Sequence, residues 1–302
     1  MTAVSTADDH TNQDQSVDTG SVVVPHLRRS RSHRWFDHVS HTTLWIGGIA
    51  SMGFLLAPMV VIVLASFNQA PALNVPPDNW SLESYRGISS ALYDAFFISI
   101  RLAVIATVIS LVLAIPVSFW LTRTRGVGVR VADTMFRSPL QVPQIVLGVA
   151  LYQSFVFYQQ FAGLSLRSTF TGLVVAHLIL VTPYIIVTCV SSIEGRGMDL
   201  EHAASSLGAS NLRVFFQVSL PAIRQAVVAA SMLAMLVSFD NVPLSLFLTG
   251  PGATPLPVLL FSLSEQNLTP TLYAAATLTV AFSIVLTGLL EKFVGLRRAL
   301  QR

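Results

Sequence analysis

The sequence carries little charge for its length, and this excludes an ordinary soluble domain. Only 11% of the 302 residues are charged, whereas a soluble domain has about 25%. Hydrophobic residues make up 53% of the chain, and the mean hydropathy is +0.65. The apolar runs reach roughly 20 residues without alternating, which suits helices that cross a bilayer and does not suit barrel strands. We therefore expect an all-α membrane protein.

Several kinds of chemistry are also missing. The one cysteine, Cys189, rules out a disulfide framework within the chain. There is no metal-ligand pattern and no Gly-x-x-x-x-Gly-Lys-Ser/Thr phosphate loop, so we expect neither a metal site nor ATP hydrolysis by this chain. The net charge of +3 does not indicate nucleic-acid binding, because the basic residues stand at the ends of apolar segments, as topology determinants do.

What is present is a series of six predicted membrane spans. They cover residues 43–67, 94–121, 140–161, 169–191, 222–248 and 271–294. They form a transmembrane domain over residues 41–298, preceded by a polar tail, residues 1–40, that we expect to be disordered. Fifteen of the 18 Lys and Arg residues lie in or beside the tail, the loops at 122–139 and 192–221, and the C-terminal end. This asymmetry predicts that both termini and both loops are cytoplasmic.

The loop at residues 192–221 is polar and helix-forming, unlike the apolar segments on either side. Asp199 is a suitable N-cap, and Glu201 follows in the first turn, where an acid favours the helix dipole. Gly208 is a suitable glycine just past a helix end, and Ser210 can cap a second helix that leads to Pro221. We expect a helix–turn–helix elbow on the cytoplasmic face. The residues alone also allow an amphipathic loop lying on the membrane.

The fifth predicted span carries a polar stripe and one acid. The stripe consists of Ser231, Ala234, Ser238, Asn241 and Ser245, which lie within about 80° of one another on an ideal helix. Such a stripe suits a water-filled path or close helix packing, and both interpretations stay open. Asp240 is the one acid well inside a span, so it is expected to mark a pathway or a buried partner. His177, in the fourth span, is expected to form a helix–helix hydrogen bond.

The 192–221 loop resembles the coupling loop of ABC importer permeases. The resemblance rests on His202-Ala203-Ala204, then Gly208, then Val218-Ser219-Leu220-Pro221. The chain departs at one position, because the family usually has Glu where His202 stands, with Glu201 immediately before it. Other segments are similar to spermidine/putrescine permeases, namely residues 139–148, 176–177, 182–184, 238–241, 248–252 and 256–258. Together the similarity covers about residues 43–298.

The resemblance implies the type I ABC importer permease fold in a bacterial inner membrane. It implies a non-catalytic subunit without a cofactor of its own, which works with a dimer of ATPase subunits that use ATP and Mg²⁺. The ATPase-coupling residues would be Glu201, His202, Ala203, Ala204, Gly208, Leu220 and Pro221. A second permease, identical or different, and an extracytoplasmic solute-binding protein would complete the importer.

The resemblance also implies a small cationic organic solute as substrate, a polyamine such as spermidine or putrescine. Candidates for its path are Asp240, Ser238, Asn241 and Ser245. Two alternatives come from other classes of protein. An ion-gradient-driven secondary transporter often shows inverted repeats and several intramembrane charges, which this sequence lacks. An intramembrane enzyme requires a catalytic pair, and His177 has no recognisable partner in the sequence.

Overall fold

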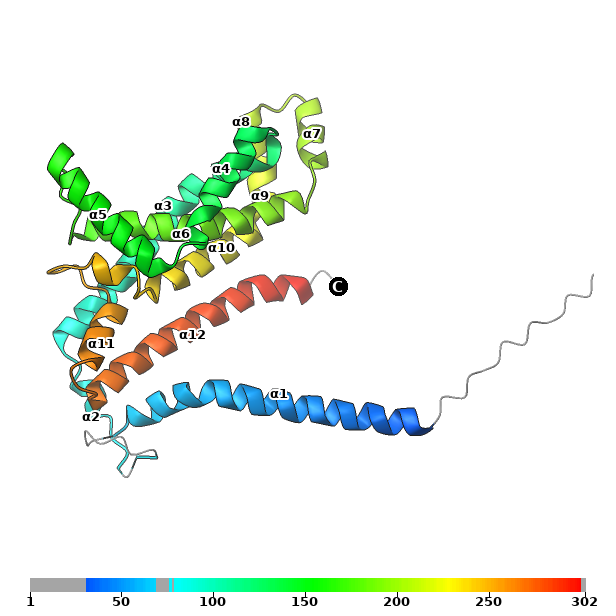
Figure 1. Ribbon diagram of the computed structural model, residues 1–302. Helices are drawn as coiled ribbons and strands as arrows, with labels where there is room; N and C mark the ends of the chain where they lie inside the picture. Colours follow the sequence, from blue (N-terminus) through cyan, green and yellow to red (C-terminus); the bar gives the residue numbers. More distant parts are fainter. Residues whose placement is uncertain (1–30, 69–75, 78, 300–302) are drawn as a thin grey trace, which may run out of the picture. The chain divides into compact units, whose positions relative to one another are not determined.

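The computed structural model describes residues 31–68, 76–77 and 79–299, and every regular element in those ranges is a helix (Figure 1). The chain divides into two compact units, residues 1–56 and 57–302. The boundary falls inside the first helix, α1 (Arg31–Ala65). In the first unit, the side chains of residues 43–56 are all exposed. Their apolar character suits a helix surrounded by lipid.

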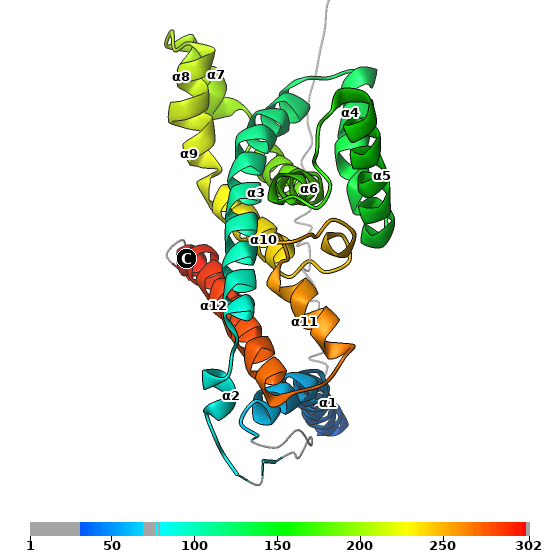
Figure 2. The same cartoon turned by 90° about the vertical axis from the view of Figure 1, so that its left-hand side faces the viewer.

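Three helices form the core of the second unit: α3 (Ser90–Arg123), α6 (Phe170–Glu194) and α10 (Arg224–Phe239). Each packs against the other two, as Figures 1 and 2 show. α6 is the most enclosed, with 61% of its most apolar window buried. It is apolar on all sides, which is typical of a helix inside a bundle. The core therefore centres on α6.

Outside α1 and residues 199–222, the remaining helices pack on this core or on one another. They are α2 (Glu83–Arg86), α4 (Val127–Arg137), the 3₁₀ turn η1 (Ser138–Leu140), α5 (Gln144–Ala162), the 3₁₀ turn η3 (Ser245–Phe247), α11 (Leu256–Ser264) and α12 (Pro270–Ala299). α12 packs on α10, where the ring centroids of Phe239 and Phe282 lie 4.4 Å apart. α5 meets η3 at Gly148, where a Cβ would lie 3.1 Å from the Leu244 carbonyl oxygen. Only a residue without a side chain fits there easily.

Five described helices are long and apolar enough to cross a membrane, or six if one bent pair counts as a single span. The bent pair is residues 211–222 and 224–239, with an angle of 69° between the two parts. It corresponds to the end of the 192–221 loop and the fifth predicted span. The chain is thus a helical membrane protein with several spans.

Two predicted boundaries were wrong. The fifth span was expected to continue to Leu248, but α10 ends at Phe239 and an irregular segment follows. Pro243 explains this end, because its missing N–H and its ring both oppose a continued helix. The tail was expected to be disordered through residue 40, but α1 begins at Arg31, since extending an existing helix costs little. Residues 1–30 lie outside the described residues.

Candidate functional site

The 192–221 loop forms an elbow, here defined as residues 199–222. It contains α7 (Asp199–Ser206), α8 (Asn211–Val214), the π-helical turn η2 (Phe215–Ser219) and α9 (Leu220–Ala222). In both views α7, α8 and α9 lie together near one end of the core helices (Figures 1 and 2). Asp199 was expected to be the N-cap of the first helix, but it is the first helical residue and Met198 takes the cap position. The predicted pair of helices joined by a turn is otherwise present.

Gly208 shapes the turn of the elbow. Its φ of +85° lies in the left-handed region, which glycine adopts without steric cost. The Gly208 N–H donates to the Ser205 carbonyl at 2.9 Å, and the Ala209 N–H donates to the Ala204 carbonyl at 3.1 Å. These two bonds form a Schellman motif. The predicted role of this glycine at the helix end is confirmed.

Pro221 lies close to the joint between the elbow and α10, where the two helical parts meet at 69° with the break at Ile223. It cannot donate a backbone hydrogen bond, and its ring would clash with the carbonyl four residues earlier. The helix widens into η2 just before it, where the Leu220 N–H donates to the Phe215 carbonyl, five residues back. Such π turns often accommodate an irregularity inside a helix. The Leu-Pro pair of the motif thus marks the joint between the elbow and α10.

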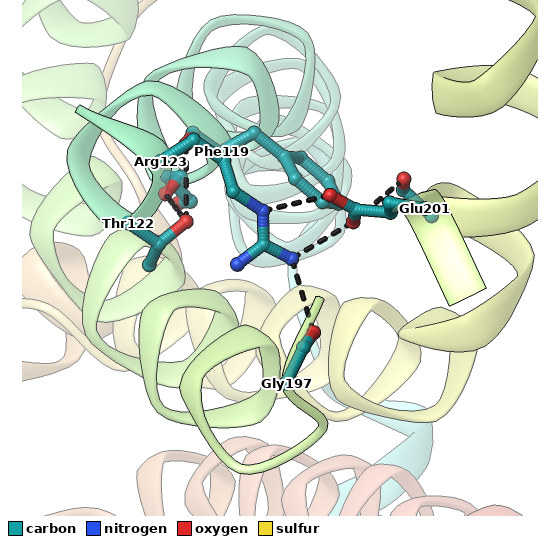
Figure 3. Close-up of polar contacts among 7 residues, drawn as sticks. Phe119, Thr122, Arg123, Gly197 and Glu201 are labelled. Atoms are coloured by element: carbon teal, nitrogen blue, oxygen red, sulfur yellow. Dashed lines mark hydrogen bonds and ion pairs between the residues drawn. The ribbon is translucent and has the colours of Figure 1, made fainter. Parts of the chain in front are cut away.

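Glu201 locks the elbow to the end of α3 (Figure 3). The Arg123 Nε and Nη2 atoms donate to the two carboxylate oxygens of Glu201, both at 2.8 Å. The Ser219 hydroxyl, from η2, donates to the Glu201 Oε1 at 2.8 Å. Arg123 also donates to the Gly197 carbonyl at 3.4 Å. One carboxylate therefore joins α3, α7 and η2, and the side chains of Arg123 and Glu201 are only 21% and 20% exposed.

The surroundings of Glu201 keep it ionised. Partial burial raises the pKa of its carboxyl, but the hydrogen bonds from Arg123 and Ser219 and the positive charge of Arg123 outweigh burial and lower the pKa below its usual range. A two-bond contact between a guanidinium and a carboxylate is among the stronger polar contacts in proteins. Nearby, the rings of Phe119 and Phe215 meet edge to face at 5.1 Å and add an apolar contact between α3 and η2.

The other predicted coupling residues lie on the elbow surface. His202 and Ala203 are exposed, and Ala204 is half-buried. The sequence reasoning missed four large apolar side chains that the elbow also exposes: Leu200 (69%), Leu207 (90%), Leu212 (72%) and Phe216 (61%). Their exposure is informative because the elbow is otherwise polar. A surface of this kind is typical of a protein–protein contact.

Three of the four predicted path residues instead belong to a buried polar hub, defined as Gln144, His177, Ser238, Asn241 and Ser245. The His177 ring nitrogens contact the Ser238 hydroxyl at 2.7 Å and the Ser245 hydroxyl at 2.9 Å. The Asn241 amide donates to the Gln144 side-chain oxygen at 2.8 Å. The expected helix–helix hydrogen bond of His177 is confirmed. In this conformation, the hub connects α5, α6, α10 and η3. Ser238, Asn241 and Ser245 are almost fully buried in it.

Asp240 lies apart from the hub, at the end of α10. Its carboxylate accepts hydrogen bonds from the Ser283 hydroxyl of α12 at 3.2 and 3.4 Å. It borders two cavities of about 630 and 360 Å³. Thr279 is shared by both, and the larger one continues along α12 past Ser283, Thr287 and Glu291. Among the described residues, those that line the two cavities include two acids and no Lys, Arg or His.

Residues 104–298 match the family described as binding-protein-dependent transport system inner membrane component. The chain belongs to this family. The inner membrane component is 30% identical over 252 residues to the putrescine transport system permease protein PotI of Escherichia coli K12, which covers 82% of this chain and 89% of PotI. It is 29% identical over 246 residues to the spermidine/putrescine permease PotC of Haemophilus influenzae, covering 78% and 90% of the two chains.

A solved structure gives the same result for the fold. A chain of a bacterial ABC transporter involved in import of the acidic polysaccharide alginate superposes with a TM-score of 0.66 at 18% identity, covering 87% of this permease and 98% of that chain. The predicted family is confirmed, and the protein is the permease subunit of an ABC importer, a non-catalytic transport component. Neither alternative, the secondary transporter or the intramembrane enzyme, is supported by the family.

Proposed function

We propose that this permease has six spans, pairs with a second permease and carries a polyamine across the membrane. Relatives whose names specify putrescine or spermidine support this substrate class. In the proposed topology, the bent pair forms the fifth span and both termini and the elbow are cytoplasmic, in line with the distribution of arginines. The partners are a second permease, an ATPase dimer that uses ATP and Mg²⁺, and an extracytoplasmic solute-binding protein.

The observation that carries the substrate class is the position of Asp240 between two cavities. An ionised acid within a span is costly unless it meets a cation or polar partners. Its one hydrogen-bonding side chain among the described residues is the Ser283 hydroxyl, which leaves acceptor capacity on the carboxylate. With Ser283, the residues Thr279, Thr287 and Glu291 follow the same face of α12 at steps of four residues. A cationic amine passing along this face would find acceptors at every turn.

This proposal is tested by Asp240→Asn in the reconstituted importer with its binding protein. We expect uptake of spermidine or putrescine to fall about tenfold or more, since one charge-assisted hydrogen bond contributes about 1.5–3 kcal/mol. Assembly with the ATPase should stay intact, as judged by co-purification. Asp94→Asn is the matched control, because Asp94 is an exposed acid of α3 that lines neither cavity. Unchanged uptake kinetics in Asp240→Asn would remove this residue from the path.

We further propose that the elbow docks on the ATPase through its exposed apolar side chains. Leu207, at 90% exposure, makes the sharpest test. Leu207→Ser removes apolar surface without disturbing internal packing, so we expect weaker co-purification of the ATPase and unchanged membrane insertion. Leu164→Ser, at a site 55% exposed between α5 and α6, is the control. Deletion of residues 201–208 should abolish the association, and full retention of the ATPase would contradict the docking role.

A further inference from the structure

The ends of two candidate spans and one short helix enclose a polar pocket that the proposed transport path does not include. α3 ends at Arg123, α6 ends at Glu194, and α4 contacts both helices. The pocket has a volume of about 270 Å³. Its lining residues are Leu121, Thr124, Arg125, Gly126, Val129, Arg130, Asp133, Arg137, Val190 and Glu194. Because both candidate spans end here, the pocket lies outside the hydrocarbon core, on one membrane surface.

α4 has the two faces expected of a helix in the membrane interface. Val127, Val131 and Met135 recur every four residues and are 76%, 53% and 69% exposed. Its charged residues Arg130, Asp133 and Arg137 line the pocket instead. A short helix with an exposed apolar face and a charged face is typical of helices that lie at the boundary of headgroups and acyl chains. An exposed apolar face of this kind suits contact with lipid, and the charged face of the same helix lines the pocket.

The charges in the pocket are only partly compensated. Arg137 Nε contacts Asp133 Oδ1 at 2.6 Å. Within the described part of the chain, Arg125, Arg130 and Glu194 take part in no ion pair. The two arginines come from α4 and the residues before it, whereas Glu194 comes from α6. Guanidinium groups bind phosphate oxygens through paired hydrogen bonds, and a carboxylate accepts hydrogen bonds from an ammonium group.

We propose that this pocket binds the headgroup of an ethanolamine phospholipid. Arg125 and Arg130 hold the phosphodiester, and Glu194 holds the ammonium group. The mixed charges select this headgroup over a purely anionic one, since a headgroup without an ammonium group leaves the Glu194 carboxylate without a positive partner. The bound lipid would tie α4 to the ends of α3 and α6, next to Arg123, which holds the elbow.

The test is native mass spectrometry of the assembled importer in detergent, with phosphatidylethanolamine, phosphatidylglycerol and inorganic phosphate as probes. Wild type should bind phosphatidylethanolamine about tenfold more tightly than phosphatidylglycerol, as one added charge-assisted contact implies. Arg125→Gln with Arg130→Gln should reduce binding of both lipids to background. Glu194→Gln should abolish the preference and keep phosphatidylglycerol binding. Arg167→Gln, at the opposite end of α6, is the control and should change nothing.

Three results would overturn the proposal. Equal binding of lipid by wild type and the double arginine variant would show that there is no headgroup site. A wild-type preference for phosphatidylglycerol would show that the pocket binds anions without a role for Glu194. Displacement of lipid by millimolar inorganic phosphate would assign the pocket to a free ion. The thermal unfolding of each variant in lipid-free detergent, compared with that of Arg167→Gln, separates loss of the site from loss of the fold.

Discussion

Glu201 and Arg123 are 78 residues apart in the sequence and share two hydrogen bonds of 2.8 Å. The arginine ends α3, and the glutamate lies in the first turns of α7. Ser219 adds a third bond from the joint that leads to α10. The carboxylate is therefore placed where a movement of the elbow would be passed directly to two core helices. The lock depends on Glu201 and not on His202, the residue at the position where the family usually has Glu.

Replacing Glu201 by Gln should loosen the elbow. The neutral amide has one acceptor oxygen for the two guanidinium donors. Because the pair is partly exposed, we expect the free energy that holds the elbow to α3 to fall by about 1–2 kcal/mol. Hydrogen–deuterium exchange should show about tenfold less protection in α7. Transport should fall more than ATPase binding. Asp199→Asn, an acid of the same turn without an ion pair among the described residues, is the control, and equal effects of both changes would contradict the lock.

The same contact predicts a response to pH. Because the folded pKa of Glu201 is lowered, the ion pair stabilises the elbow fully above the unfolded glutamate pKa of about 4.3, and this contribution is lost as the pH falls through the lower folded value. We therefore expect protection of α7, corrected for intrinsic exchange, to stay constant from about pH 8 to pH 5. In Glu201→Gln, the protection of α7 should remain constant at lower pH too. Loss of wild-type protection near neutral pH would contradict this account.

Gly208→Ala should strain the turn of the elbow. A Cβ at this position meets nothing within 4 Å, so the cost comes from the backbone alone. An alanine at a φ of +85° costs about 1–2 kcal/mol. We expect reduced protection of α7 and weaker co-purification of the ATPase. Gly195→Ala is a close control, since Gly195 has an ordinary helical φ of −67°. Similar behaviour of the two variants would show that the left-handed turn is not required.

His177→Ala should lower stability without changing substrate selectivity. It leaves the buried hydroxyls of Ser238 and Ser245 without their histidine partner, which costs about 1–3 kcal/mol for an unsatisfied group. Thermal unfolding in detergent measures this loss, and the exposed His202→Ala is the control. Adding Ser238→Ala and Ser245→Ala should cost less than the sum of the separate changes, because all three act through one hub. A changed KM at unaltered stability would instead favour a substrate role.

Local sequence signals correctly predicted the features that depend on neighbouring residues. Gly208 ends α7 because the turn requires a left-handed residue, and Pro221 follows the widened turn η2 before α10. The same local logic failed at the far end of α10. There the polar residues were projected onto an ideal helix, but the helix stops at Phe239. The stripe left Asp240 out, as the structure does, but it could not show that its polar residues bond to His177 and Gln144 of other helices.

The sequence by itself determined that this is a helical membrane protein with an elbow between its apolar segments, because length, hydropathy and cap residues act locally. Only the tertiary structure decided which polar groups meet. It paired Glu201 with Arg123, enclosed His177 between Ser238 and Ser245, and left Asp240 beside two cavities. Such contacts join residues many positions apart, and their geometry follows from how the helices pack, for which helical periodicity carries no signal.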